Sequence, residues 1–412
     1  MKNKKFRTTA LIQLMSFALV VLLFSCTKDK NYNEPASTDK TKPGVVTNIR
    51  VENFNGGAHI IYTLPNSANL LYVMAGYEIR AGVKRETKAS YYTDTITVQG
   101  FQSAGEYKVT LETVSRANVK SDPVVVTVNP EEPYFKLSAA TIELTADFGG
   151  VNVRAHNPDK RSFGYILLEL DPIINEYGII EQHYDAVENV NFSVRGYDTR
   201  ARKFGAYILD EWGNTSDTVF AEISPLFETQ LVKSNFFKYG LPSDTETGYG
   251  WELPYLWDGK TDGYSNGWHT NPGGSYPMIC TFGLGVYAKL SRFILHNRPL
   301  QFAYSHGNPR KFSLWGTDKV SPQNAVLPAY SDEGTVIGDW TNLGNFNFPD
   351  PPSGLMPGAT NASDEAFVAA GVNFNIPLAS PKTRYIRLNV AETWSGGDFA
   401  HAMEITLFGD PN

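Results

Sequence analysis

The sequence is poor in cysteine, in basic residues and in long hydrophobic runs, and each shortage excludes a class of protein. Its 412 residues include only two cysteines, Cys26 and Cys280, so cysteine zinc sites, thioredoxin motifs and disulfide frameworks cannot be built. The one extended apolar stretch, residues 11–24, is too short to cross a bilayer as a stable helix. Lysine and arginine number 36 against 43 aspartates and glutamates, so the chain lacks the excess of positive charge that is typical of nucleic-acid-binding proteins.

Motifs of the common enzyme classes are also missing. The chain has no Ser-His-Asp arrangement, no phosphate-cradling glycine loop and no His-Glu-x-x-His pair. A glycosidase needs two carboxyl groups that face each other across a cleft. Four carboxylates fall in predicted loops near the C-terminus, namely Asp350, Asp364, Glu365 and Asp398. We expect no enzyme, and a glycosidase remains the alternative if two of these carboxylates converge.

The N-terminus has the pattern of a processing signal. Four basic residues precede the apolar stretch, which predicts a signal peptide over residues 1–25. The segment that ends in Cys26 resembles a bacterial lipobox, which implies acylation of Cys26; an ordinary signal peptide with a coincidental cysteine is the alternative. Removal of the leader leaves 32 basic against 43 acidic residues, a net charge of −11.

Residues 26–42 are polar and are expected to form a flexible tether between the lipidated cysteine and the first domain. Lys28 and Asp29 resemble the export signal of Bacteroides-type surface lipoproteins, with retention on the periplasmic leaflet as the alternative. The expected location is therefore the outer membrane, with exposure at the cell surface.

The remaining chain has the pattern of tandem β-sandwiches. Aromatic residues make up 13%, glycine and proline are frequent, and the apolar runs are short and alternating. The spacing of turn-forming residues between these runs predicts an all-β chain of three domains, over residues 43–130, 131–225 and 226–412.

The first two predicted domains resemble fibronectin type III or immunoglobulin-like sandwiches. Strands are expected at 45–51, 59–63, 77–80, 94–98, 107–114 and 124–128, and then at 141–145, 150–156, 165–170, 191–194, 203–209 and 217–223. Tyr107 falls at the position of a tyrosine corner, where a hydroxyl ties the start of a strand to upstream backbone. The proline-bounded link at 130–133 is expected to be stiff.

Two segments near the C-terminus are the most informative part of the chain. The first has an Asp-Gly loop at Asp258, followed by Trp268 and His269; the second has a small-residue loop at Trp394, followed by a strand with Glu404. This pattern resembles the discoidin domain, also called the coagulation-factor C-type or galactose-binding-like domain. The resemblance implies a jelly-roll sandwich that binds ligands and rarely catalyses.

The same resemblance implies one structural Ca²⁺ beneath the loop. The matching residues are Asp258 and Glu404, with Asp262 and Ser265 as further oxygen donors. Hard Ca²⁺ takes six to eight oxygen ligands, and carboxylates mixed with backbone carbonyls suit it. The alternative is that Asp258 caps a turn and Glu404 pairs with a cation.

The resemblance also implies a carbohydrate site on the loops. His269, Arg298, Asn308 and Trp394 occupy the positions of the family's ligand-binding residues, and Trp394 is expected to be exposed. Neighbouring residues that could replace them are Tyr304, His306 and Phe399. Trp268 is expected to be buried, and Tyr249 and Trp251 form another exposed-looking aromatic pair.

The whole architecture resembles the surface lipoproteins of Sus-like glycan-uptake systems. It implies a non-catalytic protein that binds a glycan, of galactose type within this family, through its C-terminal domain. The implied partners are the membrane, through acylated Cys26, and an outer-membrane transporter. The alternative is an adaptor lipoprotein that contacts a partner protein through the same domain.

Overall fold

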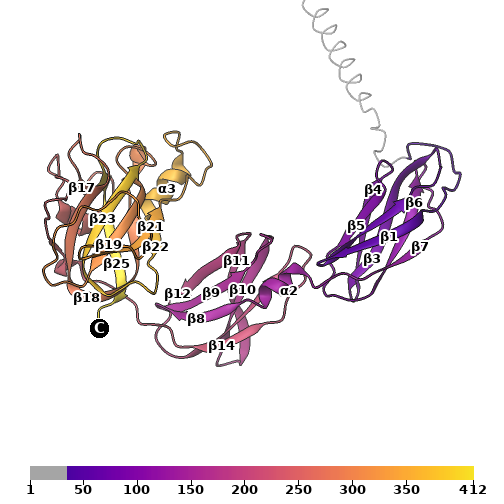
Figure 1. The fold of residues 1–412 in the computed structure, drawn as a ribbon, viewed down its shortest axis with the longest axis horizontal. Helices are drawn as coiled ribbons and strands as arrows, with labels where there is room; N and C mark the ends of the chain where they lie inside the picture. Colours follow the sequence, from indigo (N-terminus) through magenta and orange to yellow (C-terminus); the bar gives the residue numbers. More distant parts are fainter. Residues whose placement is uncertain (1–34) are drawn as a thin grey trace, which may run out of the picture.

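A computed structural model describes residues 35–412, and it confirms an all-β chain in which three β-sandwiches follow one another (Figure 1). The predicted signal peptide and Cys26 lie outside the described residues. Within residues 35–412, no helix is long and apolar enough to cross a membrane.

The first sandwich packs a three-stranded sheet against a four-stranded sheet, as fibronectin-like domains do. The sheets are β1 (Thr47–Phe54), β2 (Gly57–Thr63) and β5 (Thr95–Gln99), and β4 (Val83–Ser90), β3 (Leu70–Arg80), β6 (Tyr107–Ser115) and β7 (Val124–Val128). The tyrosine corner is confirmed, because the Tyr107 hydroxyl donates to the Ser103 carbonyl at 3.0 Å. The edge strand β4 was not predicted.

The second sandwich repeats this arrangement after a short helix, α2 (Tyr134–Ala139). Its sheets are β12 (Asn189–Arg195), β9 (Gly150–His156) and β8 (Glu143–Asp147), and β11 (Glu176–Asp185), β10 (Phe163–Asp171), β13 (Arg202–Leu209) and β14 (Val219–Ile223). The edge strand β11 was missed. Its side chains are mostly exposed, so it lacks the alternating pattern of a half-buried strand.

The third sandwich is built around one long strand, β18 (Met278–His296), where the apolar pattern of the sequence predicts two separate strands, 278–284 and 289–296. Its first half pairs with β23 (Thr383–Thr393) and its second half with β25 (Glu404–Asp410), so β18 belongs to both layers. The other strands are β15 (Thr229–Gln230), β16 (Phe237–Lys238), β19 (Pro309–Thr317), β20 (Val336–Ile337), β21 (Trp340–Asn347) and β22 (Val372–Asn375).

A large apolar core fills the space between the two layers of the third sandwich. Trp268 and Phe282 are fully buried in it, as is Leu388 of β23. Cys280 lies in the same core, as its place in the apolar run 278–282 predicts for a small residue, and burial raises the pKa of its thiol. A helix that was not predicted, α3 (Ala362–Ala370), begins at a capping box. The side chains of Asn361 and Asp364 each accept a hydrogen bond from the backbone amide of the other residue.

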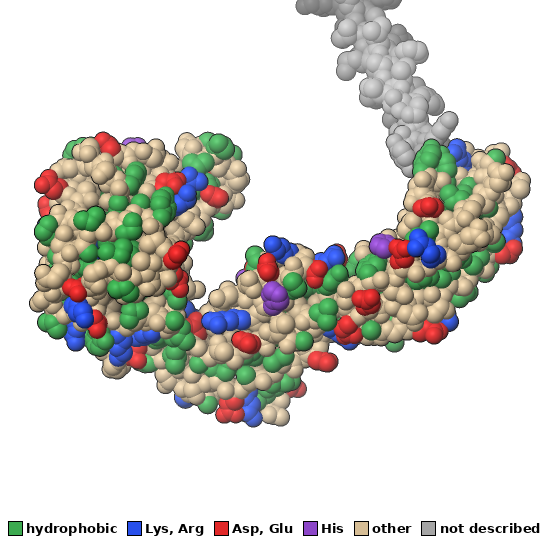
Figure 2. All heavy atoms as spheres, viewed as in Figure 1, with side chains coloured by type: hydrophobic (Ala, Val, Ile, Leu, Met, Phe, Trp, Pro, Cys, Tyr) green, Lys and Arg blue, Asp and Glu red, His purple; other side chains and the backbone are tan. Residues whose placement is uncertain are grey.

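Ion pairs join the second sandwich to the third. Glu228 lies between Arg195 of β12, at 3.8 Å, and Arg292 of β18, at 3.1 Å. Arg195 also pairs with Asp147 at 3.0 Å. On the face shown in Figure 2, acidic and basic side chains are interspersed, so this face carries no large area of one charge.

Candidate ligand-binding face

A short two-stranded ribbon brings the two informative segments together at one end of the third sandwich. β17 (Trp268–His269) pairs with β24 (His401–Ala402), and this register sets His269 opposite His401. Residues more than a hundred positions apart thereby share one surface. Trp268 faces inward and is fully buried, as expected.

Aromatic rings gather around His269. The Phe399 ring stacks on the imidazole with centroids 5.0 Å apart and an interplanar angle of 7°. Tyr249 and Trp251 meet the same imidazole edge-on, at 5.2 and 5.6 Å. Tyr249 is 73% exposed, whereas Trp251, His269 and Phe399 are half-buried. We call these four residues, with Arg298, Phe302 and His306, the aromatic face.

Arg298 is held among the rings of this face. Its Cζ lies 3.7 Å from the Phe302 ring centroid and 4.9 Å from that of Trp251. Its Nε donates to the Gly263 carbonyl at 3.1 Å. Within residues 35–412 its two terminal nitrogens have no hydrogen-bond partner, so they remain available as donors. Burial lowers the pKa of this guanidinium, which still stays charged at neutral pH.

The two histidines of the ribbon are neutral at physiological pH. Burial lowers the pKa of His269 and takes that of His401 well below its usual range. The His269 Nδ1 lies 2.6 Å from the Thr270 carbonyl, so Nδ1 carries the proton and Nε2 is an acceptor. His401 is 1% exposed, and in the described part of the chain neither of its ring nitrogens has a partner.

A strained loop, residues 300–308, carries two members of the aromatic face, Phe302 and His306. Leu300, Tyr304 and His306 all have positive φ, between 52° and 60°. Buried Asn308 holds this loop, since its Nδ2 donates to the carbonyls of Arg298 and Phe302 at 3.0 and 2.8 Å. Its Oδ1 accepts from the Arg298 amide at 2.7 Å. Asn308 therefore positions Arg298.

The loop that carries Phe399 is fixed to the strained loop. The Ser395 amide and hydroxyl both donate to the His306 carbonyl, at 3.1 and 2.8 Å. The Phe399 ring lies over Gly307, where a Cβ would come within 2.7 Å of the ring. Glycine is required at this position by that close approach, not by its backbone angles.

Several predicted ligand-binding residues lie elsewhere. The expectation that Trp394 is exposed was wrong: Trp394 is 9% exposed, belongs to the apolar core of the third sandwich, and packs edge-on against buried Tyr304 with ring centroids 5.0 Å apart. Tyr304 and Asn308 are also buried and have structural roles. The structure brings His269, Arg298, His306 and Phe399 together, as the sequence suggested.

Phe302 is the member of the face that the sequence analysis missed. Its ring contacts both Arg298 and His306, the latter edge-on at 4.8 Å. Its position four residues before His306, in a segment of mixed polar and aromatic residues, was the only available signal.

Each of the predicted calcium ligands makes hydrogen bonds or ion pairs with partners of its own. Glu404 accepts from the Lys233 ammonium at 2.6 Å and from the Gly259 amide at 2.7 Å, so both of its oxygens are used. Both Asp262 oxygens accept hydrogen bonds within their own turn, including two from Ser265. Asp258 lies 3.4 Å from the Lys260 ammonium.

As they lie, these residues do not fit a shared calcium shell. No group of three or more His, Cys, Asp or Glu residues able to hold a metal ion occurs in residues 35–412. Calcium at Glu404 would require Lys233 to move away, and it stays a prediction.

Two of the four loop carboxylates, Asp364 and Asp398, have structural partners as well. Asp364 is buried in the capping box of α3; burial raises its pKa, but hydrogen bonds from Asn361 and Ser353 outweigh this and leave the pKa below its usual value. Asp398 accepts from the Gly273 amide at 2.7 Å.

Three domain-family models match separate parts of the chain, and each covers less than half of it. They are the domains of unknown function DUF4959 over residues 43–130, DUF5126 over 131–234 and DUF5000 over 257–409. No curated protein matches the sequence.

Solved structures give distant matches. A SusE-like protein is 22% identical over 68% of this chain and 100% of its own, with a TM-score of 0.41. The C-terminal domain of a chitobiase from Bacteroides fragilis is 19% identical over 44% of this chain and 97% of its own, with a TM-score of 0.28. A two-domain fibronectin type III segment of chicken tenascin is 12% identical over 44% and 99%, with a TM-score of 0.23. Scores this low carry no argument about function.

Proposed function

We propose that this chain is a non-catalytic, cell-surface glycan-binding protein and that the aromatic face of the third sandwich holds the glycan. The observation that supports this most directly is the stacked pair of His269 and Phe399 beside Arg298, whose terminal nitrogens have no partner in the described residues.

The chemistry of the face suits a sugar. An aromatic ring packs against the C–H surface of a pyranose, and a few polar groups then fix its orientation. The rigid fork of Arg298 can donate to two adjacent hydroxyls, and the His269 Nε2 can accept from a third. Both histidines of the ribbon are neutral, so the face does not select for an anion through them.

The sequence resemblance to Sus-like surface lipoproteins supplies the cellular context of the proposal. Acylation of Cys26 would anchor the chain, the tether would let the sandwiches reach outward, and an outer-membrane transporter would take up the captured glycan. A galactose-type sugar is the first ligand to test, because the discoidin resemblance includes galactose-binding-like domains.

Binding at one such face is expected to be weak. A sugar on an open surface gains few contacts, and these must offset the loss of translational and rotational freedom. Many anchored copies on one cell would raise the effective affinity for a repetitive polysaccharide.

The test is a glycan-array screen of the chain from residue 35 onward, beside Arg298→Ala and Phe399→Ala. Arg384→Ala is the matched control, because Arg384 lies 4.5 Å from the exposed Tyr287 ring, an arginine–aromatic contact outside the face. The proposal expects array signals that both face variants lose and the control keeps. A chain that binds no glycan but captures a partner protein through Phe399 would favour the adaptor alternative.

A further inference from the structure

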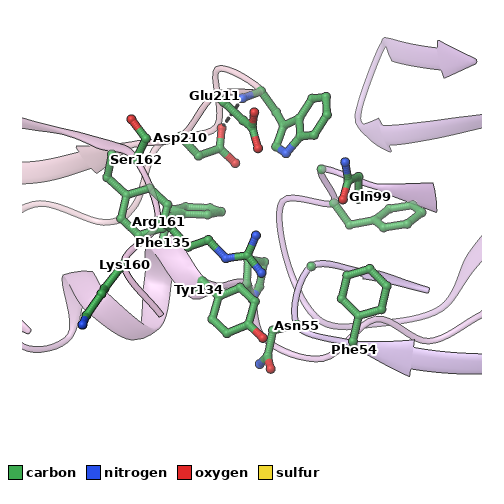
Figure 3. A pocket seen from close by; sticks show the side chains of 16 residues that line it. Phe54, Asn55, Gln99, Tyr134, Phe135, Lys160, Arg161, Ser162, Asp210 and Glu211 are labelled. Carbon is green, nitrogen blue, oxygen red and sulfur yellow. Dashed lines mark hydrogen bonds between the residues drawn. The ribbon is translucent and has the colours of Figure 1, made fainter. Parts of the chain in front are cut away.

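A second recess lies at the joint between the first and second sandwiches, far along the chain from the aromatic face. It is a cleft of about 260 Å³ whose lining comes from both domains. This is close to the lower end of the range, roughly 300–1,000 Å³, that ligand pockets occupy. Figure 3 shows Asp210 and Glu211 on one side, Gln99 and Asn55 on the other, and Arg161 with Tyr134 between them.

Hydrogen bonds between the two sandwiches hold the walls of this cleft at a fixed distance. The Asn214 Nδ2 donates to the Gly100 carbonyl at 3.0 Å, and the Arg80 Nη1 donates to the Trp212 carbonyl at 3.3 Å. On the other side, the Asn55 Nδ2 donates to the Glu132 carbonyl at 2.7 Å. A cleft with fixed walls loses little entropy when a ligand enters.

Close packing reinforces the joint. The indole of Trp212 lies directly over Gly100, where a Cβ would come within 2.9 Å of the ring. The guanidinium of Arg85 covers the same indole, with its Cζ 4.2 Å from the ring centroid. The loop that carries Asp210 and Glu211 is therefore clamped to the first sandwich.

Several planar polar groups in the cleft have no partner within residues 35–412. The side chains of Arg161, Glu211 and Gln99 make no hydrogen bond or ion pair there, although Arg161 and Glu211 line the same space. Arg161 instead lies over the Tyr134 ring, with its Cζ 4.8 Å from the centroid. A guanidinium, a carboxylate and a carboxamide thus meet beside an aromatic ring.

The other joint provides a contrast. A cleft of about 450 Å³ there is lined by Arg195 and Asp147, but these two side chains pair with each other at 3.0 Å. The main charges of that cleft therefore have partners, whereas Arg161 and Glu211 of the first cleft have none within residues 35–412.

The charges of the first cleft balance. Lys160 and Arg161 are opposed by Asp210 and Glu211, so the lining carries no net formal charge. Planar groups that can each bond two neighbouring hydroxyls, set beside ring surfaces, match a neutral polyhydroxylated ligand better than an anion, a cation or a purely apolar molecule.

We propose that this cleft is a second binding site, for a short neutral segment of a glycan. The ligand class follows from the lining of the cleft, so the inference stands apart from the aromatic face. Glu211 accepts from sugar hydroxyls, Gln99 accepts from and donates to them, Arg161 donates to adjacent oxygens, and the rings of Tyr134 and Phe54 cover the C–H surface.

The experiment removes the aromatic face first. The chain from residue 35 onward, carrying Arg298→Ala and Phe399→Ala, is titrated by calorimetry with short neutral oligosaccharides of α-glucan, β-glucan, galactan, mannan and xylan type. Arg161→Ala with Glu211→Gln is then added. Lys203→Ala with Glu222→Gln is the control, because these exposed residues are paired neighbours on β13 and β14 outside the cleft and make the same charge change.

The expected result is an oligosaccharide that still binds the face variant, and whose affinity falls about tenfold or more with the cleft changes but not with the control pair. Hydrogen exchange should also show ligand protection at residues 160–163 and 210–213. Thermal unfolding of each variant separates lost contacts from lost structure.

Two results would overturn the inference: no oligosaccharide binds the face variant at millimolar concentration, or the cleft changes leave the affinity unchanged. The two proposals fail separately. Binding abolished by the face changes alone leaves the proposed function standing, and binding abolished by the cleft changes alone removes the aromatic face instead.

Discussion

The first two sandwiches and the third solve the problem of presenting a binding surface in different ways. The first two have the same three-plus-four sheets, and their recess forms only where they meet, around the Trp212 loop. The third spreads one 19-residue strand, β18, over both layers and carries long loops that form a surface without help from a neighbour. In the cleft, contacts between two domains fix the positions of the lining residues. On the aromatic face, the rings lie on loops, and buried residues of the same domain fix their positions.

Both surfaces pair an arginine with aromatic rings, but they hold it differently. Arg298 is half-buried between two rings and anchored through Nε. Arg161 is exposed and rests on one ring. We therefore expect ligand binding at the aromatic face to depend on the packing of the core of the third sandwich. Binding in the cleft should depend on the contacts between the first two sandwiches.

The largest effect is expected from Trp394→Ala, which tests whether the loops of the third sandwich rest on its core. Truncation of a buried tryptophan typically costs about 3–5 kcal/mol. Chemical denaturation followed by tryptophan fluorescence should show this loss in the transition of the third sandwich. Trp251→Ala, at a half-buried position on the face, should cost much less. Equal losses for the two would contradict the burial of Trp394 in the core.

The joint is tested by Gly100→Ala, which places a methyl group against the Trp212 ring. Overpacking of this kind typically costs about 1–3 kcal/mol. Gly82→Ala is a matched control, since Gly82 also has positive φ, 78° against 92°, but nothing lies within 4 Å of its Cβ. Small-angle scattering should show a changed arrangement of the first two sandwiches for Gly100→Ala alone. Identical behaviour of both variants would mean that backbone strain, not the Trp212 contact, determines the result.

A smaller effect concerns pH. Burial raises the pKa of Glu404 to about 7, although Lys233 and the Gly259 amide donate to it. The folded state therefore holds a proton that the unfolded state has lost, so this group's contribution to stability falls as pH rises from about 4.5 to about 7. Glu404→Gln cannot titrate and should flatten that slope, which is at most about 1.4 kcal/mol per pH unit for one group.

The histidines of the third sandwich act in the opposite direction. Burial lowers the pKa values of His269, His296 and His401, so their contribution to stability is lost as pH falls below about 6.5. Wild type and Glu404→Gln both contain these three histidines. The difference between their unfolding midpoints therefore reports the titration of Glu404. A constant difference from pH 5 to pH 8 would contradict the raised pKa.

The smallest effect is expected from calcium. Both Glu404 oxygens are used by Lys233 and Gly259, so adding Ca²⁺ or a chelator should leave the unfolding midpoint of the wild type unchanged. A bound ion would raise stability by about 2.7 kcal/mol at a hundredfold excess over its Kd. Such a shift in calorimetry would support the calcium site that the sequence resemblance implies.

The sequence predicted the all-β architecture well because most strands bury one face, and it failed where burial does not follow local pattern. Edge strand β11 (Glu176–Asp185) is mostly exposed on both faces. Edge strand β4 (Val83–Ser90) alternates in burial, but its inward residues include Arg85 and Thr87, so neither strand has a core-facing pattern of apolar residues. The break between the two predicted halves of β18 is a bulge in one continuous strand.

The site was predicted in part for a similar reason. His269 and Phe399 could be named because each lies beside a recognisable motif. Trp394 was misplaced because its sequence neighbours are small, while Tyr304, the buried ring that packs against it, comes from a distant segment. The cleft at the first joint could not be predicted at all, since it exists only in the packing of Trp212 against Gly100.

The most direct test of glycan binding at the aromatic face is a calorimetric titration of the best array glycan into wild type and Phe399→Ala. Phe399 is half-buried and stacks on His269 at the surface, so its truncation should remove a ligand contact and leave the core intact. A glycan site on the aromatic face predicts a loss of affinity of about tenfold with an unchanged unfolding midpoint. Equal affinity for the two chains would contradict a glycan site on the aromatic face.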